Sequence, residues 1–206
     1  MELVEGMVTT VAEKVLGTLQ IQHREDRVIN LASPWRRVPY KDLVCEHLGA
    51  DWYALPRDAK LAKLQAANLE LPPNATEQEI THELYEKTIE PTLIQPTFVT
   101  RLPKELVPLA KACEDDPTLV DVYELEINGQ ELSPGYSELN HPLEQRQRFI
   151  EQIAAGQDPT NAEAGKLDED FLLALEHGMP PAGGMGLGID RLVMLLTAAP
   201  SIRDVI

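Results

Sequence analysis

The sequence predicts an α+β fold in which helices flank an antiparallel sheet. Hairpin-like segments and amphipathic helices follow one another in mixed order, without the regular strand–helix–strand alternation that produces a parallel sheet. The clearest hairpin spans residues 118–139, where Asn128-Gly129 supplies a two-residue turn. No internal repeat or low-complexity block interrupts the 206 residues, so we expect one domain with a sizeable core.

Residues 1–92 are predicted to form a helical region that contains one hairpin. The segment 1–17 favours a helix that ends at Gly17. A short hairpin is expected over 18–31, a turn and strand over 33–40, and helices over 41–49 and 57–70. The apolar face of the first helix is expected to consist of Leu3, Met7, Val8, Val11 and Val15.

A capping box predicts where the next helix begins. Thr76 is followed three residues later by Glu79, the spacing at which the two residues cap each other's backbone. We expect a buried stripe on this helix before Pro91 ends it. The stripe consists of Ile80, Leu84 and Thr88.

Residues 93–206 are predicted to hold the sheet. A strand over 95–102 comes first, then a turn and short helix over 104–113, and then the hairpin. A polar helix over 142–156 and an acidic loop over 157–167 follow, with another helix over 168–178. The glycine-rich stretch 180–188 leads into a closing helix from Asp190.

Charge and cysteine content limit the classes of function. Carboxylates outnumber Lys and Arg by 34 to 18, which argues against a surface that binds a nucleic-acid backbone by itself. A small polyanion such as a nucleotide remains compatible with this balance of charge.

Cys45 and Cys113 are too few for a disulfide framework and lack metal-ligand spacing, which favours a reducing cytoplasm. Glu2 and Glu5 distinguish the N-terminus from a signal peptide, and no apolar run is long enough to span a membrane.

The predicted hairpin gathers acidic side chains. Pairing outward from the two-residue turn places Glu126 opposite Glu131 and Glu124 opposite Ser133, so the three glutamates share one face. Like charges in this arrangement destabilise a sheet. Two interpretations stay open, a solvated acidic face or a site for Mg²⁺, which shares its coordination shell with carboxylates and substrate phosphates.

The glycine run and the arginine after it form the second candidate feature. Glycine weakens strand interiors, so four glycines indicate either a packing turn or a backbone that a flat ligand approaches closely. Arg191 lies in the first turn of the next helix and suits bidentate phosphate contact. The alternative for Arg191 is a salt bridge to Asp190 or Asp204. Together with the acidic hairpin, these residues indicate a nucleoside triphosphate site.

Four segments of the sequence resemble a known family. The stretch "GGMGLGIDRLVMLLT" followed by "SIRDVI" is similar to motif 3 of class II aminoacyl-tRNA synthetases, in the form found in class II lysyl-tRNA synthetases. The segments 32–44, 89–111 and 122–149 resemble the same family in the same order. The resemblance implies a class II antiparallel catalytic fold that activates lysine with ATP and Mg²⁺.

The resemblance implies a role for each matching residue. Glu124 and Glu131 match the two metal-binding glutamates, and Arg191 matches the catalytic arginine on the γ-phosphate of ATP. Glu138 matches the carboxylate that pairs with the lysine ε-ammonium, and Tyr136 matches an aromatic position beside the substrate. Further ATP contacts are expected at Gly186 and Gly188. Because strict alternation would put Glu138 and Glu131 on opposite faces, we expect a bulge at Pro134-Gly135.

Differences from the family pattern leave two functions open, an enzyme that needs further domains or a non-catalytic binding protein. Pro134 stands where these enzymes commonly have a substrate-contacting asparagine, Val107 replaces a serine, and His141 replaces an aspartate. The anticodon-binding domain, the dimer-forming motif 1 and the motif 2 arginine have no counterpart in these residues, so we expect no activity from this chain alone. It would bind tRNA only with those domains, and a homodimer or partner chain would supply motifs 1 and 2. The alternative is a non-catalytic binding protein built on part of a synthetase.

Overall fold

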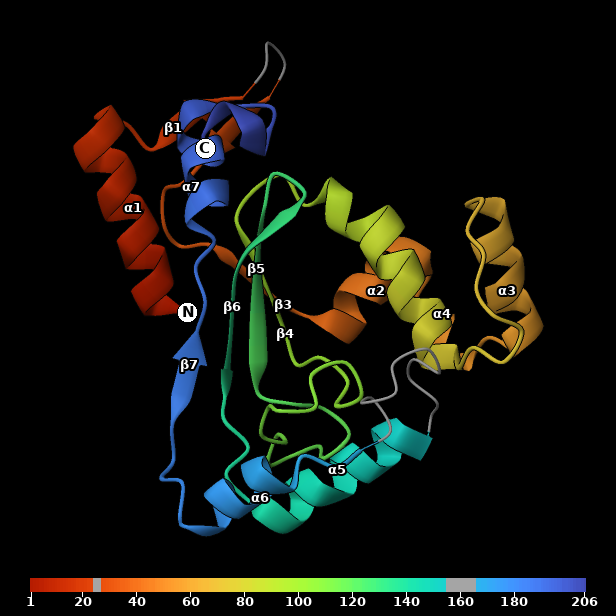
Figure 1. Cartoon of the computed structure of the whole chain (residues 1–206). Helices are drawn as coiled ribbons and strands as arrows, with labels where there is room; N and C mark the ends of the chain where they lie inside the picture. The colour runs from red at the N-terminus through yellow and green to blue at the C-terminus, as the bar shows by residue number, and fades with distance from the viewer. Residues whose placement is uncertain (24–26, 155–165) are drawn as a thin grey trace. The chain divides into compact units, whose positions relative to one another are not determined.

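The structure is a computed structural model that describes residues 1–23, 27–154 and 166–206 (Figure 1). A five-stranded sheet has the order β3-β4-β5-β6-β7, and β1 and β2 form a separate antiparallel pair. The sheet is rich in antiparallel pairing, with helices beside it, as predicted. One pair departs from that pattern, because β3 and β4 run parallel.

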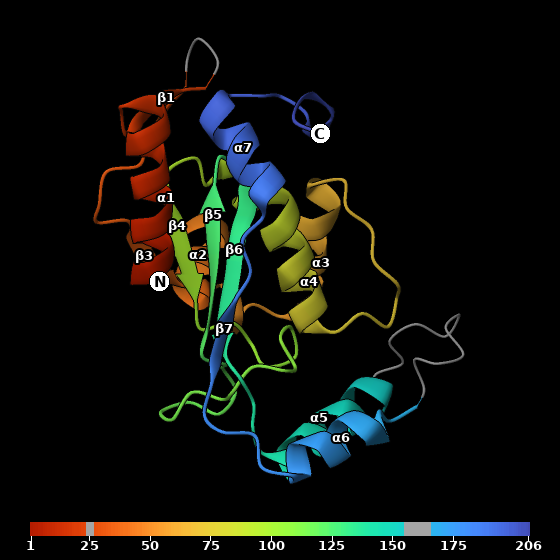
Figure 2. The same ribbon diagram turned by 60° about the vertical axis from the view of Figure 1, so that its left-hand side comes forward.

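The elements of the N-terminal half follow the predicted order (Figures 1 and 2). They are α1 (Glu2–Leu16), β1 (Gln20–Gln22), β2 (Val28–Asn30), β3 (Arg36–Pro39), α2 (Tyr40–Leu48), η1 (Trp52–Ala54), α3 (Arg57–Ala66), α4 (Glu77–Leu84), a π-helical turn η2 (Tyr85–Ile89) and η3 (Glu90–Thr92).

The elements of the C-terminal half hold the sheet and the glycine-rich strand. They are β4 (Thr97–Thr100), β5 (Val122–Ile127), β6 (Gln130–Ser137), α5 (Pro142–Ala154), α6 (Glu169–Glu176), β7 (Gly183–Met185), α7 (Ile189–Thr197) and η4 (Ile202–Asp204). Most of the expected acidic loop 157–167 lies outside the described residues.

The chain divides into two compact units, and each is described by itself. The first comprises Met1–Thr100, Glu124–Pro134 and Gly186–Ile206, and the second comprises Arg101–Tyr123 and Gly135–Met185. In the first unit the Trp35 and Phe98 rings pack 5.7 Å apart, and Trp52 is fully buried. In the second unit α5 packs against α6, where Phe149 and Phe171 lie 6.0 Å apart.

The predicted orientation of α1 is wrong. Of the expected apolar face only Val8 is buried, and it lies in a buried row with Val4 and Ala12. Glu5 fixes this rotation, because its carboxylate accepts from the Trp35 backbone N–H at 3.2 Å and lies 3.6 Å from Arg37 Nη2. The remaining face is an exposed apolar stripe of Leu3, Met7, Val11 and Val15.

The capping box and the hairpin turn are confirmed. The Thr76 hydroxyl accepts from the Glu79 backbone N–H, and the Glu79 carboxylate accepts from the Thr76 N–H. Ile80 and Leu84 are buried as expected, whereas Thr88 is only partly so. Asn128 and Gly129 both have positive φ, 59° and 72°, as a type I′ hairpin turn requires.

The short helix expected over 104–113 is absent. Backbone groups of this segment bond outside it instead: Lys111 N–H donates to the Ser137 carbonyl of β6 at 2.7 Å, and Cys113 N–H donates to the Leu119 carbonyl at 2.9 Å. Pro108 interrupts the segment and has no N–H for a helical bond. The stretch is therefore a series of turns that adds isolated bridges to the second unit.

Candidate functional site

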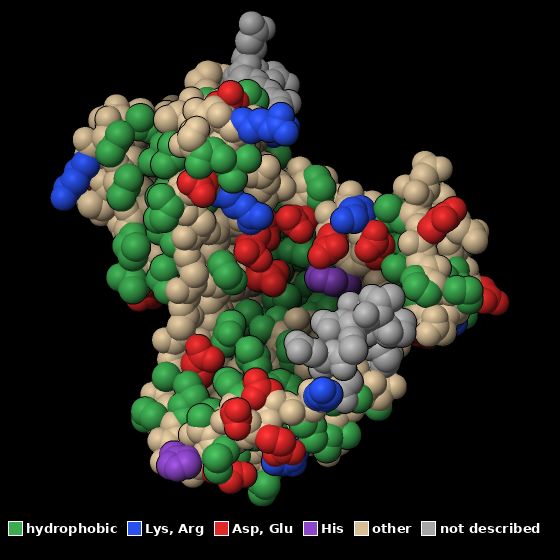
Figure 3. Space-filling model, viewed as in Figure 1, with side chains coloured by type: hydrophobic (Ala, Val, Ile, Leu, Met, Phe, Trp, Pro, Cys, Tyr) green, Lys and Arg blue, Asp and Glu red, His purple; other side chains and the backbone are tan. Residues whose placement is uncertain are grey.

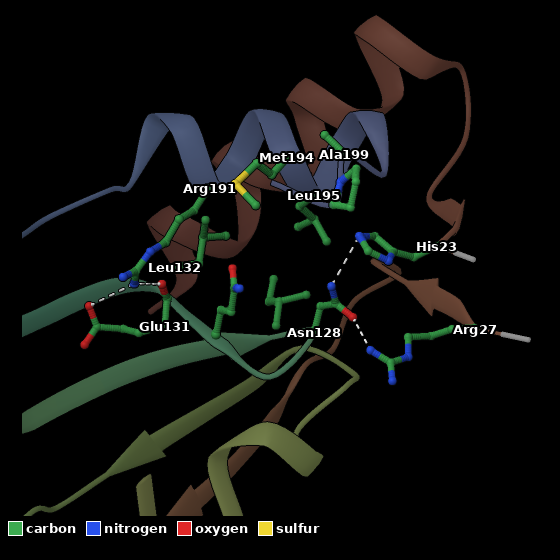
Figure 4. Close-up of a pocket in the computed structure, with 12 residues that line it drawn as sticks. His23, Arg27, Asn128, Glu131, Leu132, Arg191, Met194, Leu195 and Ala199 are labelled. Atoms are coloured by element: carbon green, nitrogen blue, oxygen red, sulfur yellow. Dashed lines mark hydrogen bonds and ion pairs between the residues drawn. The ribbon is translucent and has the colours of Figure 1, made fainter. Parts of the chain in front are cut away.

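Arg191 meets Glu131 where α7 begins. Arg191 Nη1 lies 4.0 Å from Glu131 Oε1 and donates a hydrogen bond to the backbone carbonyl of Glu131 (Figure 4). Both side chains remain partly exposed. Among the described residues Glu131 is the ion-pair partner of Arg191, rather than Asp190 or Asp204.

Glu124 lies on β5 within the same electrostatic environment. Burial, followed by the negative charges of Glu131, Glu90 and Glu86, raises the pKa of Glu124 to about 7. The hairpin therefore brings Glu124 and Glu131 close enough to repel each other. A cation placed between them would relieve this repulsion.

Glu126 is the most buried carboxylate of the group. Its side chain is 1% exposed, and Oε2 has no hydrogen-bond partner in the described part of the chain. Burial, followed by the charges of Glu90, Glu124 and Glu131, raises the pKa of Glu126 to about 9, while Arg191 lowers it. This raised pKa favours the protonated, neutral form of Glu126 at pH 7.

Glu86 and Glu90 are site residues that sequence reasoning missed. They lie on η2 and η3, and their charges raise the pKa of Glu124. A pair of glutamates four residues apart on a predicted helix carries no signal of its own, because such residues usually face solvent. Figure 3 shows the resulting gathering of acidic side chains over the β5–β6 hairpin, beside a basic side chain.

The donor set fits a magnesium ion that shares its shell with a substrate. Among the described residues, no group of three or more His, Cys, Asp or Glu side chains is arranged to hold a metal ion. Mg²⁺ is commonly bound through one or two carboxylates, with water and phosphate oxygens completing the octahedron. Glu124 and Glu131 match that minimal requirement, and the repulsion between them favours a cation.

The two expected nucleotide-contacting glycines extend the edge strand. Gly186 N–H donates to the Pro134 carbonyl at 2.8 Å, and Gly188 N–H donates to the Leu132 carbonyl at 2.9 Å. A Cβ at Gly186 would lie 3.5 Å from the Pro134 ring, which is ordinary contact. Folding of this chain therefore does not require glycine there, and the bare backbone leaves space for a ligand.

The second unit holds Tyr136 and Glu138. A Cβ at Gly184 would lie 2.8 Å from Glu138 Oε1, so this glycine of β7 makes room for the Glu138 carboxylate. Burial and the charge of Glu138 raise the pKa of Tyr136. The expected bulge at Pro134-Gly135 remains a prediction, although β6 runs through both residues as a single strand.

A cavity of about 330 Å³ adjoins Glu138 within this unit. Ser137 Oγ donates to Asp121 Oδ2 at 2.5 Å on its wall, and Lys111 and Asn140 also line it. The volume is at the lower end of the range for small-molecule pockets. Carboxylates in its wall suit a ligand that carries an ammonium group.

A family model of known proteins matches this chain. The model of the class II tRNA synthetases of the D, K and N type matches residues 1–206, the whole chain. The chain belongs to this family. As a member of the class II synthetases, it carries its acidic hairpin on the antiparallel-rich sheet described above and Arg191 at the start of α7.

Relatives of this class II synthetase chain are named lysine–tRNA ligases. It is 49% identical to the enzyme of Thermosynechococcus vestitus, 47% to that of Carboxydothermus hydrogenoformans and 44% to that of Staphylococcus haemolyticus. Each alignment covers 100% of this chain and 41–42% of the relative. The chain thus spans about two fifths of the length of these relatives. No helix in the described ranges is long and apolar enough to cross a membrane.

Proposed function

We propose that this chain forms the C-terminal part of the catalytic domain of a lysine–tRNA ligase that works in the cytoplasm. The observation that carries the proposal is the contact of Arg191 with Glu131, in a chain that matches lysine–tRNA ligases over its whole length. In the proposed reaction the lysine carboxylate attacks the α-phosphate of ATP, and pyrophosphate leaves. The lysyl-adenylate formed in this step then passes its lysyl group to tRNA with release of AMP, which also requires domains outside these residues.

In the first unit we assign the phosphate-binding groups. Arg191 contacts the γ-phosphate, because a guanidinium in the first turn of a helix combines its charge with the positive end of the helix dipole. Glu124 and Glu131 hold Mg²⁺, which neutralises phosphate charge when bound. Gly186 and Gly188 form the flat backbone against which the nucleotide lies.

In the second unit we assign the amino-acid groups. Glu138 pairs with the ε-ammonium of lysine, and Tyr136 packs beside the aliphatic part of the substrate. The carboxylate-lined cavity next to Glu138 supports this assignment, since a buried ammonium requires an opposite charge. Pro134 removes one polar contact that other members of the family provide.

We further propose that the 206-residue chain binds Mg²⁺–ATP but does not activate lysine by itself. The γ-phosphate cation and the metal carboxylates lie within it, whereas no residue of this chain is assigned to the α-phosphate. Negative charge develops at that phosphate during attack. Loss of one pre-organised electrostatic group at such a position costs about 10²–10³ in rate.

The test compares binding with lysine-dependent ATP–pyrophosphate exchange on the purified chain. We expect calorimetry to detect Mg²⁺–ATP binding that Arg191→Ala and Glu131→Gln weaken. Glu138→Gln is the matched control, because it removes a carboxylate assigned to lysine rather than to ATP. Robust exchange without a partner would contradict the proposed inactivity, and equal ATP affinity in all variants would contradict the site.

A non-catalytic interaction protein is the second candidate. The exposed stripe of α1 favours it, since Leu3 and Val15 are 68% and 69% exposed. Figure 3 shows hydrophobic side chains gathered over α1. The edge strand β7 is exposed along its length as well, and an unpaired edge invites strand addition. A second copy or a chain carrying motifs 1 and 2 would cover these surfaces. Size-exclusion chromatography with light scattering tests for a second copy. Complementation by a chain that carries motifs 1 and 2 tests for that partner.

A further inference from the structure

Helix α5 carries a buried arginine, Arg148, that none of the roles assigned above uses. Arg148 belongs to the second unit and is only 5% exposed. Its Nη2 donates to Glu144 Oε1 at 2.6 Å, one turn earlier on the same helix. Burying a guanidinium costs free energy unless its other N–H groups also find acceptors. Those acceptors must come from outside α5.

The acceptors are backbone carbonyls of the 104–113 segment. Arg148 Nη1 donates to the Ala110 carbonyl at 2.5 Å and to the Pro108 carbonyl at 3.3 Å. Gln145 lies three residues before Arg148, on the same face of the helix, and is fully buried. Its Nε2 donates to the Pro108 carbonyl at 3.3 Å. Two buried side chains of α5 therefore hold a segment that forms no helix of its own.

The opposite side of the 104–113 segment is bonded to the backbone around Glu138. An isolated antiparallel bridge pairs Ala110 with Glu138. The two bonds of this bridge are Leu139 N–H to the Leu109 carbonyl at 2.9 Å and Lys111 N–H to the Ser137 carbonyl at 2.7 Å. The residue that Arg148 holds by its carbonyl is thus the residue that faces Glu138.

Glu138 is held from its other side by the chain that leads into β7. Its N–H donates to the Ala182 carbonyl at 2.9 Å, and its Oε1 occupies the space that a Cβ at Gly184 would need. The 104–113 segment consists of turns, so its position depends on bonds to its neighbours rather than on a ladder of its own. Where α5 holds this segment therefore determines where one side of Glu138 lies.

We propose that Arg148, assisted by Gln145, positions Glu138 for the side-chain ammonium of lysine. Arg148 is a positioning residue, because it acts through the 104–113 segment and does not contact the substrate. The inference rests on the proposed function, in which Glu138 pairs with that ammonium. Binding groups must be held within about 0.5 Å of their productive geometry, so a supporting bond one segment away affects affinity.

Titration of the full chain with lysine and with norleucine, followed by NMR, tests the proposal. Norleucine has the carbon chain of lysine without the ε-ammonium. Arg148→Met should weaken lysine binding about tenfold and norleucine binding less than about twofold. Arg148→Lys keeps the charge and should restore part of the lysine affinity. Arg146→Met is the matched control and should change neither affinity, because Arg146 also lies on α5 but pairs with Glu169 on α6.

A double variant shows whether Arg148 acts through Glu138. Equal lysine affinity in Glu138→Gln and in Glu138→Gln combined with Arg148→Met supports the proposal, since the two losses are then not additive. Additive losses, or an equal loss of lysine and norleucine affinity, would give Arg148 a general structural role and overturn it. Gln145→Leu removes one of the supporting bonds and replaces Arg148→Met in the same series if that variant does not fold.

Hydrogen exchange without ligand separates this inference from the proposed function. In Arg148→Met the amides of Leu139 and Lys111 should exchange faster, while those of α6 keep their protection. Unchanged exchange at both amides would overturn the positioning role alone. Faster exchange in a chain whose parent binds no lysine, or whose Glu138→Gln variant binds it normally, would contradict the proposed role of Glu138 and overturn the inference with it.

Discussion

Arg191 and Glu131 are joined through both the backbone and the side chain of the glutamate. The guanidinium donates to the Glu131 carbonyl and faces its carboxylate at 4.0 Å. Because the backbone bond does not depend on the carboxylate, we expect Arg191 to keep its position when Glu131 binds another partner. The arginine is therefore already placed at the hairpin when a ligand arrives.

Arg191→Ala should weaken Mg²⁺–ATP binding by about tenfold or more, because a charge-assisted hydrogen bond contributes about 1.5–3 kcal/mol. Calorimetry at fixed Mg²⁺ measures the change. Arg203→Ala is the control, since Arg203 is exposed on η4. Equal losses in both variants would show that only net charge matters.

Glu126→Gln should stabilise the chain above neutral pH. Burial raises the pKa of Glu126 to about 9, so the folded chain keeps a proton that the unfolded chain loses near its ordinary pKa. The contribution of this proton to stability is complete below that ordinary pKa and disappears as the pH rises through about 9. The free energy of unfolding at pH 7 should rise by up to about 3 kcal/mol in the variant.

Urea unfolding at pH 5, 7 and 8.5 measures this dependence. The variant and the parent should differ by less than about 1 kcal/mol at pH 5. Glu70→Gln, at an exposed position, should leave the pH profile unchanged. A Glu126→Gln profile parallel to the parent's would mean that Glu126 is ionised in the folded state.

Thr76→Ala should lower the free energy of unfolding by about 1 kcal/mol, because it removes the acceptor for the Glu79 N–H at the start of α4. Thr10→Ala, at an exposed position within α1, is the matched control and should be neutral or slightly stabilising. Thermal unfolding followed by circular dichroism compares the two. An equal effect of both substitutions would rule out a capping contribution.

Gly135→Ala should destabilise the second unit by about 1–3 kcal/mol, the usual range for overpacking. A Cβ at this position would overlap the Tyr123 ring and hydroxyl, so the ring would have to move. Gly6→Ala is the control, since nothing lies within 4 Å of a Cβ there and alanine favours the helix. Hydrogen exchange of the second unit would locate the effect, and unchanged exchange would refute the overlap.

Paired Leu3→Gln and Val15→Gln substitutions should change the stability of the chain by less than about 0.5 kcal/mol, as expected for exposed positions. They should also abolish association with a chain that supplies motifs 1 and 2. Val8→Gln, at a fully buried position, should be strongly destabilising. Association that survives the paired substitutions would show that the partner does not contact this stripe.

Local signals predicted much of the fold. The Asn128-Gly129 turn and the Thr76 capping box depend on residues within a few positions of each other, and both are confirmed. The rotation of α1 could not be predicted in this way, because it depends on Glu5 contacting Trp35 and Arg37 about thirty residues away. The helix predicted over 104–113 does not form for a similar reason, since Lys104 N–H bonds to the Thr118 carbonyl and Lys111 N–H bonds to the Ser137 carbonyl instead of completing helical turns.

Only those parts of the candidate site whose residues are close together in the sequence could be predicted. Pairing outward from the Asn128-Gly129 turn is enough to bring Glu124 and Glu131 into one group, because the turn fixes the register of the strands on either side. The position of Glu86 and Glu90 near the acidic hairpin depends on the π-helical turn η2, and no periodicity in the sequence indicates such a turn. The pairing of Arg191 with Glu131 likewise depends on two segments sixty residues apart.

The Asn128-Gly129 turn has a consequence for protein engineering. Hairpin tips are the usual places to graft an epitope or a fluorescent label. Here Asn128 N–H donates to the Ile94 carbonyl at 3.0 Å and Gly129 N–H to the Leu93 carbonyl at 2.9 Å, so a graft would break both bonds. One added residue would also turn Glu131 to the opposite face of the sheet. A label placed at this tip would therefore disable the acidic site while leaving its sequence intact.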